Sequence, residues 1–241
     1  MRLYLSSYRI GDRAGSLLAL LSGGQEKLQT FPVRPRDHSI GSGKRAAIVE
    51  NALDNISPSA RDLYRTEAYD PVSELGSLGI AATPLDLRDH FGDPAGLRAR
   101  LSQFDLVWVT GGNAFVLRRA MKQSGFDDVI VDMLDNDDIV YGGFSAGAVV
   151  AAPSLEGIHL MDDPDEAPAG YDRGTVWDGL GLIDYAIIPH YRSPHSESAA
   201  AERAVRHLCG RGLRYRALRD GEVIVWTEDR MASADLTRRI A

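Results

Sequence analysis

The segment that decides the expected fold is Tyr141-Gly142-Gly143-Phe144-Ser145-Ala146-Gly147-Ala148-Val149-Val150. An apolar strand leads into it, and small, helix-compatible residues follow. The order Gly-x-Ser-x-Gly between a strand and a helix is the pattern of a nucleophile elbow. Such a turn holds its serine, here Ser145, in a strained backbone conformation that places the hydroxyl beyond the strand end. A serine that caps a helix after a glycine turn is the alternative interpretation.

Short apolar runs along the chain predict the rest of the sheet. Most are rich in β-branched residues and bounded by Gly, Pro or Asp; they are Leu3–Ser7, Ala46–Glu50, Ile80–Leu87, Leu106–Thr110, Ile139–Tyr141, Tyr185–Pro189 and Val223–Trp226. Stretches with helical spacing lie between many of them, at Ala60–Leu75, Gly96–Leu101, Ala114–Ser124 and Ser198–Cys209. This alternation predicts an α/β fold with a mostly parallel central sheet and helices on both faces.

No linker or internal repeat divides the 241 residues, so we expect a single domain over residues 1–241. The polar residues from about 229 to 241 are expected to form a peripheral tail. Two tracts lack clear periodicity. Gly11–Gly43 is expected to be a loop after one helix, and Met161–Gly174 to be an acidic loop. Long loops in compact domains are often functional, although a solvated surface loop is the commoner case.

The composition is that of a soluble globular protein, with 44% hydrophobic and 25% charged residues. The net charge of −7 and the lack of a basic cluster argue against a nucleic-acid partner. A single cysteine, Cys209, excludes an intrachain disulfide and favours the reducing cytoplasm. The sequence lacks a signal-peptide pattern at its start and any apolar run near the roughly 20 residues that cross a bilayer, so no membrane partner is expected.

A serine nucleophile needs a base, and histidine is the usual one. Among six histidines, His190 stands out because it ends the apolar strand Tyr185–Pro189. Parallel α/β proteins place their catalytic groups at strand ends. An acidic residue would then orient the imidazole. Asp220 precedes the last strand and is favoured, while Asp162 in the acidic loop competes for the role.

An oxyanion hole needs two backbone N–H groups that point at one atom. Ala146, directly after Ser145, can supply one of them. The second is expected from Gly111 or Gly112, which follow a strand and open the next helix. Paired glycines leave the backbone uncovered, so that a carbonyl oxygen can approach it. A tight strand-to-helix turn is the simpler interpretation of this segment alone.

Taken together, these segments resemble the dipeptidase E family, serine peptidases of family S51 that are related to class I glutamine amidotransferases. The resemblance spans about residues 1 to 228 and rests on Gly111-Gly112-Asn113, Gly143-Phe144-Ser145-Ala146-Gly147-Ala148, Pro189-His190-Tyr191 and Leu218-Arg219-Asp220-Gly221. It implies a class I glutamine amidotransferase-like fold and a Ser145 nucleophile. It also implies a His190 base and an acidic member at Asp162 or Asp220, of which Asp220 is preferred.

The resemblance has one departure, which concerns substrate specificity. Dipeptidase E prefers peptides that begin with aspartate, and an arginine after the catalytic histidine is thought to bind that carboxylate. The matching position here is Ala200 or Ala201, and Arg192 is the nearest substitute. Broader cleavage of short peptides, of dipeptidase or aminopeptidase type, is therefore expected. The acidic loop with Asp162 and Asp163 is a candidate to neutralise the ammonium group of the substrate.

No cofactor and no metal are expected. His190 and His195, with Glu197 following, could suggest a metal cluster, but their spacing across Pro194 does not put both rings on one helical face. A glutaminase is disfavoured because position 145 is serine and Cys209 lies in a predicted helix. A related hydrolase, such as a cyanophycinase or an esterase, and a non-enzymatic binding protein are the remaining alternatives. The oligomeric state is left open, with a homodimer as one alternative.

Overall fold

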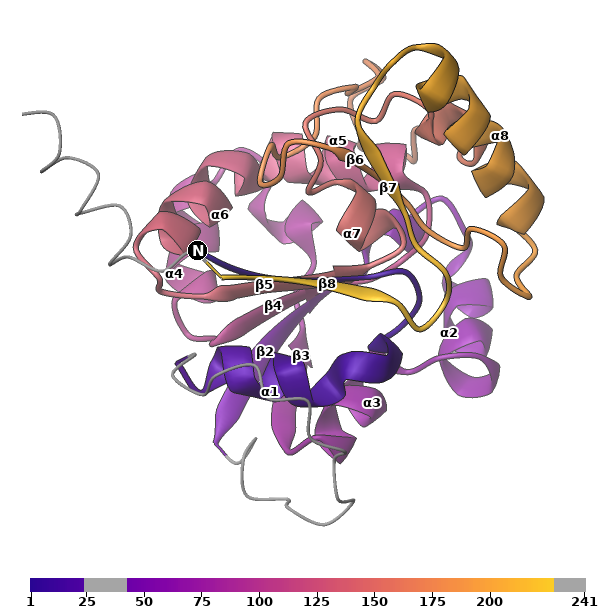
Figure 1. Ribbon diagram of the computed structural model, residues 1–241. Helices are drawn as coiled ribbons and strands as arrows, with labels where there is room; N and C mark the ends of the chain where they lie inside the picture. Colours follow the sequence, from indigo (N-terminus) through magenta and orange to yellow (C-terminus); the bar gives the residue numbers. More distant parts are fainter. Residues whose placement is uncertain (24–42, 228–241) are drawn as a thin grey trace, which may run out of the picture.

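The computed structural model describes residues 1–23 and 43–227, and its centre is a six-stranded sheet (Figure 1). The strands lie in the order β3-β2-β4-β5-β1-β8. All neighbours pair in parallel except β8, which runs antiparallel to β1 at one edge. The strands are β1 Arg2–Ser6, β2 Lys44–Val49, β3 Ile80–Pro84, β4 Leu106–Val109, β5 Val140–Phe144 and β8 Val223–Thr227. The predicted mostly parallel sheet is confirmed.

Helices cover both faces of the sheet, as predicted (Figure 1). Successive side chains of a strand point to opposite faces, so Leu3 and Tyr4 enter different cores. The core around Tyr4 includes residues of α1 (Ala14–Leu21) and α3 (Pro71–Ser77). The core around Leu3 is covered by α4 Pro94–Leu101, α5 Ala114–Ser124, α6 Phe126–Asp135, α7 Ala146–Val149 and α8 Ser198–Gly210.

One predicted helix is in fact two. The run Ala60–Leu75 divides into α2 (Pro58–Glu67) and α3, because Pro71 cannot continue a helix and starts a new one. The Asp70 carboxylate caps α3 by accepting the N–H groups of Val72 and Ser73. The described part of the chain also contains short 3₁₀ segments: η1 Gly11–Arg13, η2 Asn51–Leu53, η3 Leu87–His90 and η4 Ile158–Leu160.

The strand before His190 does not join the central sheet. It forms β6 (Ala186–Ile188), which pairs in parallel with β7 (Tyr215–Ala217) in a separate two-stranded sheet. Strand β7 was not predicted from the sequence, because a three-residue strand has too little pattern to detect. The small sheet lies beside α8, above the antiparallel edge of the central sheet (Figure 1). His190 is therefore positioned by this second sheet.

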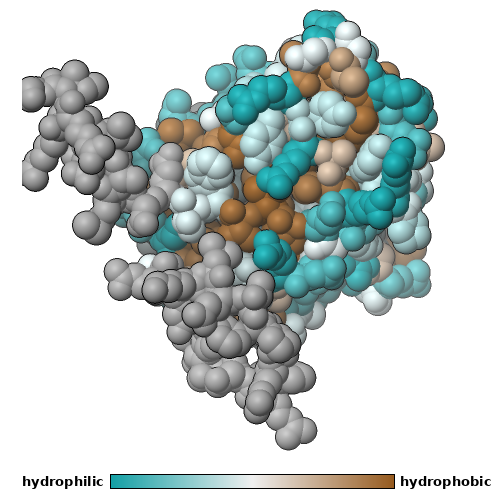
Figure 2. All heavy atoms as spheres, in the orientation of Figure 1, coloured by the Kyte–Doolittle hydropathy of each residue, from teal (hydrophilic) through white to brown (hydrophobic). Residues whose placement is uncertain are grey.

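Part of the predicted loop 11–43 and the predicted tail 229–241 lie outside the described residues. Figure 2 shows one face of the molecule, where hydrophobic residues gather near the middle and hydrophilic residues surround them. Within residues 1–23 and 43–227, no helix has the length and apolar character that a membrane span requires.

Candidate active site

Ser145 occupies the strained turn that the sequence predicted. Its φ of 48° and ψ of −117° lie outside the regions that side chains favour. The residue lies between β5 and α7, and its N–H donates to the Ser6 carbonyl at 3.2 Å. A Cβ atom at Gly147 would lie 2.1 Å from the Val109 carbonyl oxygen, so only glycine fits there. The close passage of strand and helix is thus the reason for the small residues.

The imidazole of His190 lies against the Ser145 hydroxyl. The distance from His190 Nε2 to Ser145 Oγ is 3.1 Å, and His190 is 1% exposed. Its backbone adopts a left-handed φ of 59°, and its N–H donates to Ser7 Oγ at 2.9 Å. Burial lowers the pKa of His190, and the hydrogen bond to Asp220 opposes that change. A buried, neutral imidazole next to a hydroxyl can accept its proton.

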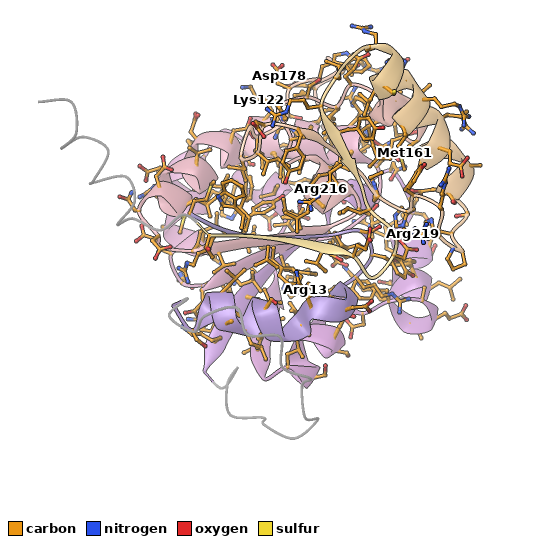
Figure 3. The ribbon with its side chains drawn as sticks, viewed as in Figure 1. Arg13, Lys122, Met161, Asp178, Arg216 and Arg219 are labelled. Carbon is orange, nitrogen blue, oxygen red and sulfur yellow. The ribbon has the colours of Figure 1, made fainter. Side chains whose placement is uncertain are left out.

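The other imidazole nitrogen is bound by Asp220. The distance from His190 Nδ1 to Asp220 Oδ1 is 2.7 Å, and the Ser7 hydroxyl donates to the same oxygen at 3.0 Å. Arg216 and Arg219 mark the path of the chain from β7 to the turn that precedes β8 (Figure 3). Because β8 runs antiparallel to β1, this turn lies at the carboxyl end of β1, next to Ser7.

The two predicted oxyanion segments also converge on the serine. A Cβ atom at Gly111 would lie 3.1 Å from the Ser145 Cβ, which places this backbone beside the nucleophile. Gly112 has a φ of 133°, and its own Cβ would lie 2.5 Å from the Ala52 carbonyl oxygen. Neither glycine N–H donates to an acceptor among the residues that the structure describes. Ala146 is the first residue of α7, so its N–H also lacks an acceptor within the helix.

Asp162 and Asp163 do not bind His190. The Asp162 carboxylate accepts the N–H of Ala114 at 2.8 Å, at the start of α5, and burial raises its pKa to about 7. The Asp163 carboxylate accepts the N–H of Asp165 at 2.9 Å within the acidic loop. The structure therefore places Asp220, the acid that the sequence favoured, against the imidazole.

Arg192 contacts Glu202 and the Tyr191 ring. Its guanidinium lies 3.8 Å from Glu202 and 5.1 Å from the centre of the Tyr191 ring, and the side chain is 59% exposed. Its backbone has a left-handed φ of 50°, like that of His190 two residues earlier. In this conformation the Arg192 side chain lies at the surface, against Glu202 of α8.

The acidic loop is held by a buried arginine. Arg119 of α5 is 1% exposed and forms no ion pair with a carboxylate of the described residues; it donates to the carbonyl oxygens of Pro164 at 2.8 Å and Asp172 at 3.1 Å. Tyr171 fixes the far end of the loop through a hydrogen bond to the Asp54 carboxylate. The predicted loop is thus anchored at two points.

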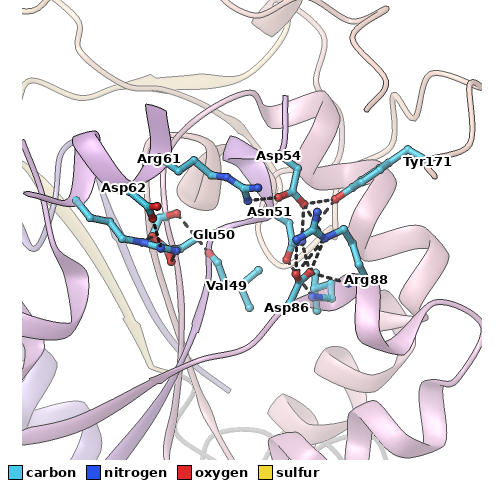
Figure 4. A network of polar contacts seen from close by, with 12 residues as sticks. Val49, Glu50, Asn51, Asp54, Arg61, Asp62, Asp86, Arg88 and Tyr171 are labelled. Carbon is cyan, nitrogen blue, oxygen red and sulfur yellow. Dashed lines mark hydrogen bonds and ion pairs between the residues drawn. The ribbon is translucent and has the colours of Figure 1, made fainter. Parts of the chain in front are cut away.

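A polar network surrounds that second anchor (Figure 4). Asp54 is 1% exposed, and Arg61 and Asn51 donate to it at 2.6 and 2.7 Å. Together with Glu50, Arg65, Asp86 and Arg88, these side chains line a cavity of about 260 Å³. The network also supports the oxyanion segment, because Ala52, next to Asn51, accepts the N–H of Asn113 at 2.8 Å. This polar network was not predicted from the sequence.

His195 and Glu197 lie next to His190. The three side chains present ligand atoms within 4.8 Å of one another, although the segment is not a helix. The two imidazole rings are stacked, with centroids 3.7 Å apart and planes 8° from parallel. A metal midway between the two rings would lie roughly 1.9 Å above each ring plane. A zinc–nitrogen bond is only about 2.0–2.1 Å long, so each bond would have to run almost perpendicular to its ring. Because imidazole lone pairs lie in the ring plane, this arrangement does not suit a shared metal.

Two residues of the site, Ser7 and Tyr8, were not predicted from the sequence. Ser7 bonds both the His190 backbone and Asp220, and Tyr8 lies edge-on to His190 with ring centroids 5.8 Å apart. Both follow β1 directly. Their position after the first strand could have indicated a role in the site, because the carboxyl ends of parallel strands meet at one edge of the sheet.

This geometry defines an α/β protein with a serine nucleophile elbow whose hydroxyl contacts a His–Asp pair. The sequence model of peptidase family S51 matches residues 55–234, which is most of the chain. The chain belongs to peptidase family S51.

Similar proteins agree with this assignment, and a solved structure shares the fold. Uncharacterized peptidase Lin0382 of Listeria innocua is 34% identical over 49% of this chain and 54% of its own length. Peptidase E of Streptomyces coelicolor is 30% identical over 72% of each chain. A crystal structure of a Listeria monocytogenes EGD-e protein matches the fold with a TM-score of 0.62 and 20% identity, covering 95% of this chain and 98% of the other. The chain spans about half the length of the Listeria relatives.

Proposed function

We propose that this protein is a serine peptidase that hydrolyses short peptides through an acyl-enzyme. The observation that supports this best is the continuous contact from Ser145 Oγ to His190 Nε2 at 3.1 Å and from His190 Nδ1 to Asp220 at 2.7 Å. The imidazole can take a proton on one side while the carboxylate stabilises the resulting charge on the other.

The reaction follows from the positions of these groups. His190 takes the proton of the Ser145 hydroxyl, and the oxygen attacks the peptide carbonyl carbon. The negative charge on the carbonyl oxygen is held by the N–H of Ala146 and the N–H of Gly111 or Gly112. His190 then gives its proton to the leaving amine as the C–N bond breaks. Water, activated by the same imidazole, hydrolyses the ester and restores the serine.

The proposed substrates are short peptides without a strict requirement for an N-terminal aspartate. Similar proteins carry the names Peptidase E and, for a Drosophila melanogaster relative, Probable alpha-aspartyl dipeptidase. In this chain Ala200 or Ala201 stands where the family resemblance leads one to expect an aspartate-binding arginine. Arg203 donates to the Leu160 carbonyl at 3.2 Å, and Arg192 pairs with Glu202. Hydrolysis of Asp-X dipeptides alone would contradict this proposal.

The decisive experiment compares wild type with Ser145→Ala on a dipeptide and aminoacyl-amide panel. Loss of the nucleophile is expected to reduce kcat by about 10⁴ to 10⁶. Ser102→Ala is the matched control, because this serine lies at the exposed end of α4 and should leave activity unchanged. A fluorophosphonate should label wild type and not Ser145→Ala. Equal hydrolysis by wild type and Ser145→Ala would refute the proposed function. A cytoplasmic location and a homodimer are predictions from the sequence that these experiments do not address.

A further inference from the structure

His195 stands outside the proposed triad, yet its ring stacks on the His190 ring. The two rings are stacked at 3.7 Å between centroids, and Tyr8 lies edge-on to both, at 5.8 Å from His190 and 5.6 Å from His195. The N–H of Glu197 donates to His195 Nδ1 at 3.2 Å, which fixes the orientation of the second ring. His190 is thus held by contacts on its face as well as by hydrogen bonds at its edges.

We propose that His195 is a positioning residue for His190, and that protonation of the His195 ring reduces the activity of the site at acidic pH. The inference rests on the proposed function, since it concerns the same serine and imidazole. It adds a residue that acts through His190 and a form of regulation by pH.

The positioning role follows from the directions of the contacts. The hydrogen bonds of His190 to Ser145 and Asp220 both lie near the ring plane, so they resist rotation within that plane more than tilting out of it. A parallel ring at van der Waals distance restricts tilting and covers one face of the imidazole from water. Loss of this ring should therefore lower kcat, because proton transfer depends on the alignment of Nε2 with the hydroxyl.

The regulatory role follows from charge. When His190 accepts the Ser145 proton it becomes cationic, and a second cation at 3.7 Å opposes that step. By Coulomb's law, the second charge lowers the equilibrium constant for protonation of His190 about sevenfold in bulk water and about two-thousandfold at an effective dielectric constant near 20. Because His195 is half-buried, we expect a reduction of about tenfold or more.

Other titratable groups face the pair from each neighbouring segment. Asp220, before β8, bonds His190 Nδ1, and Glu197, in the loop of His195, lies 3.9 Å from His190 Nε2. Tyr8, after β1, contacts both rings. The two carboxylates favour a cation on His190, whereas His195 is the nearby group that opposes it once charged.

The test measures kcat, KM and their pH dependence for wild type, His195→Phe and His195→Ala over about pH 5 to 8, where imidazoles titrate. For wild type, kcat/KM should fall towards acidic pH, and the fall should be steeper than the titration of a single group would produce. His195→Phe keeps a ring without a proton, so its profile should show a single group. His195→Ala should lose about tenfold in kcat at neutral pH with KM unchanged, and His195→Phe should restore most of it. His159→Phe is the control for the same exchange outside the site.

The rate at which a fluorophosphonate labels Ser145 should follow the same pattern, which makes the result independent of the substrate. Wild-type kinetics in His195→Ala, or the wild-type pH profile in His195→Phe, would overturn this inference while leaving the proposed function intact. A Ser145 that is never labelled and never needed for hydrolysis would refute the proposed function, and this inference with it.

Discussion

The change Asp220→Asn tests the charge that stabilises the protonated imidazole. The carboxylate lies 2.7 Å from His190 Nδ1, with the two side chains 19% and 2% exposed. At this distance and an effective dielectric constant near 20, the attraction to an imidazolium is about 6 kcal/mol. An uncharged amide of the same shape forfeits that attraction at the moment when His190 takes the serine proton. We therefore expect kcat to fall by about 10⁴.

The matched control is Asp162→Asn, which removes the competing acid. Asp162 binds the Ala114 N–H and makes no hydrogen bond to His190, so kcat should fall by less than about tenfold. Initial rates of dipeptide hydrolysis for both variants, with circular dichroism to verify folding, give the comparison. If Asp162→Asn lost about 10⁴ in kcat while Asp220→Asn stayed within about tenfold of wild type, the assignment of the triad acid would be wrong.

Three further predictions concern stability and the support of the site. The pKa of Asp162 is raised to about 7 by burial, so the folded protein binds this proton more tightly than the unfolded chain, and stability should decrease as pH rises from about 4 through 7. Urea midpoints of Asp162→Asn should depend less on pH over that range; equal slopes would contradict this. Gly147→Ala should lower the free energy of unfolding by about 3 kcal/mol, because the added methyl group would meet the Val109 carbonyl. An unchanged thermal unfolding midpoint would disprove the close contact. Ser7→Ala leaves the buried His190 N–H without its acceptor. We therefore expect the free energy of unfolding in urea to fall by about 1–3 kcal/mol and kcat to fall about tenfold. Wild-type values for both would show that Ser7 is dispensable.

Much of the fold could be predicted because its signals are local. Buried parallel strands are short apolar runs, and the elbow needs glycine and alanine wherever strand and helix meet closely. Gly147 beside the Val109 carbonyl is the clearest example, since the structure leaves no room there for any side chain. The division of the predicted helix before Pro71 was missed, although proline and its preceding Asp70 were visible in the sequence.

The contacts of the site could not be predicted because they join residues far apart in the chain. The sequence favoured Asp220 but left Asp162 as a competing acid, and the antiparallel pairing of β8 with β1 brings Asp220 to the imidazole. The strand before His190 was predicted correctly as a strand, but its place in a separate small sheet depends on pairing with β7.

The sequence by itself determined the type of fold and the candidates for nucleophile and base, the serine at the elbow and the histidine at a strand end. These features depend on which residues a turn or a strand end can accommodate. Only the tertiary structure decided which acid faces His190 and that His195 stacks upon it. Those contacts depend on strand pairing and loop packing, in which distances between remote segments are set by the whole core rather than by neighbouring residues.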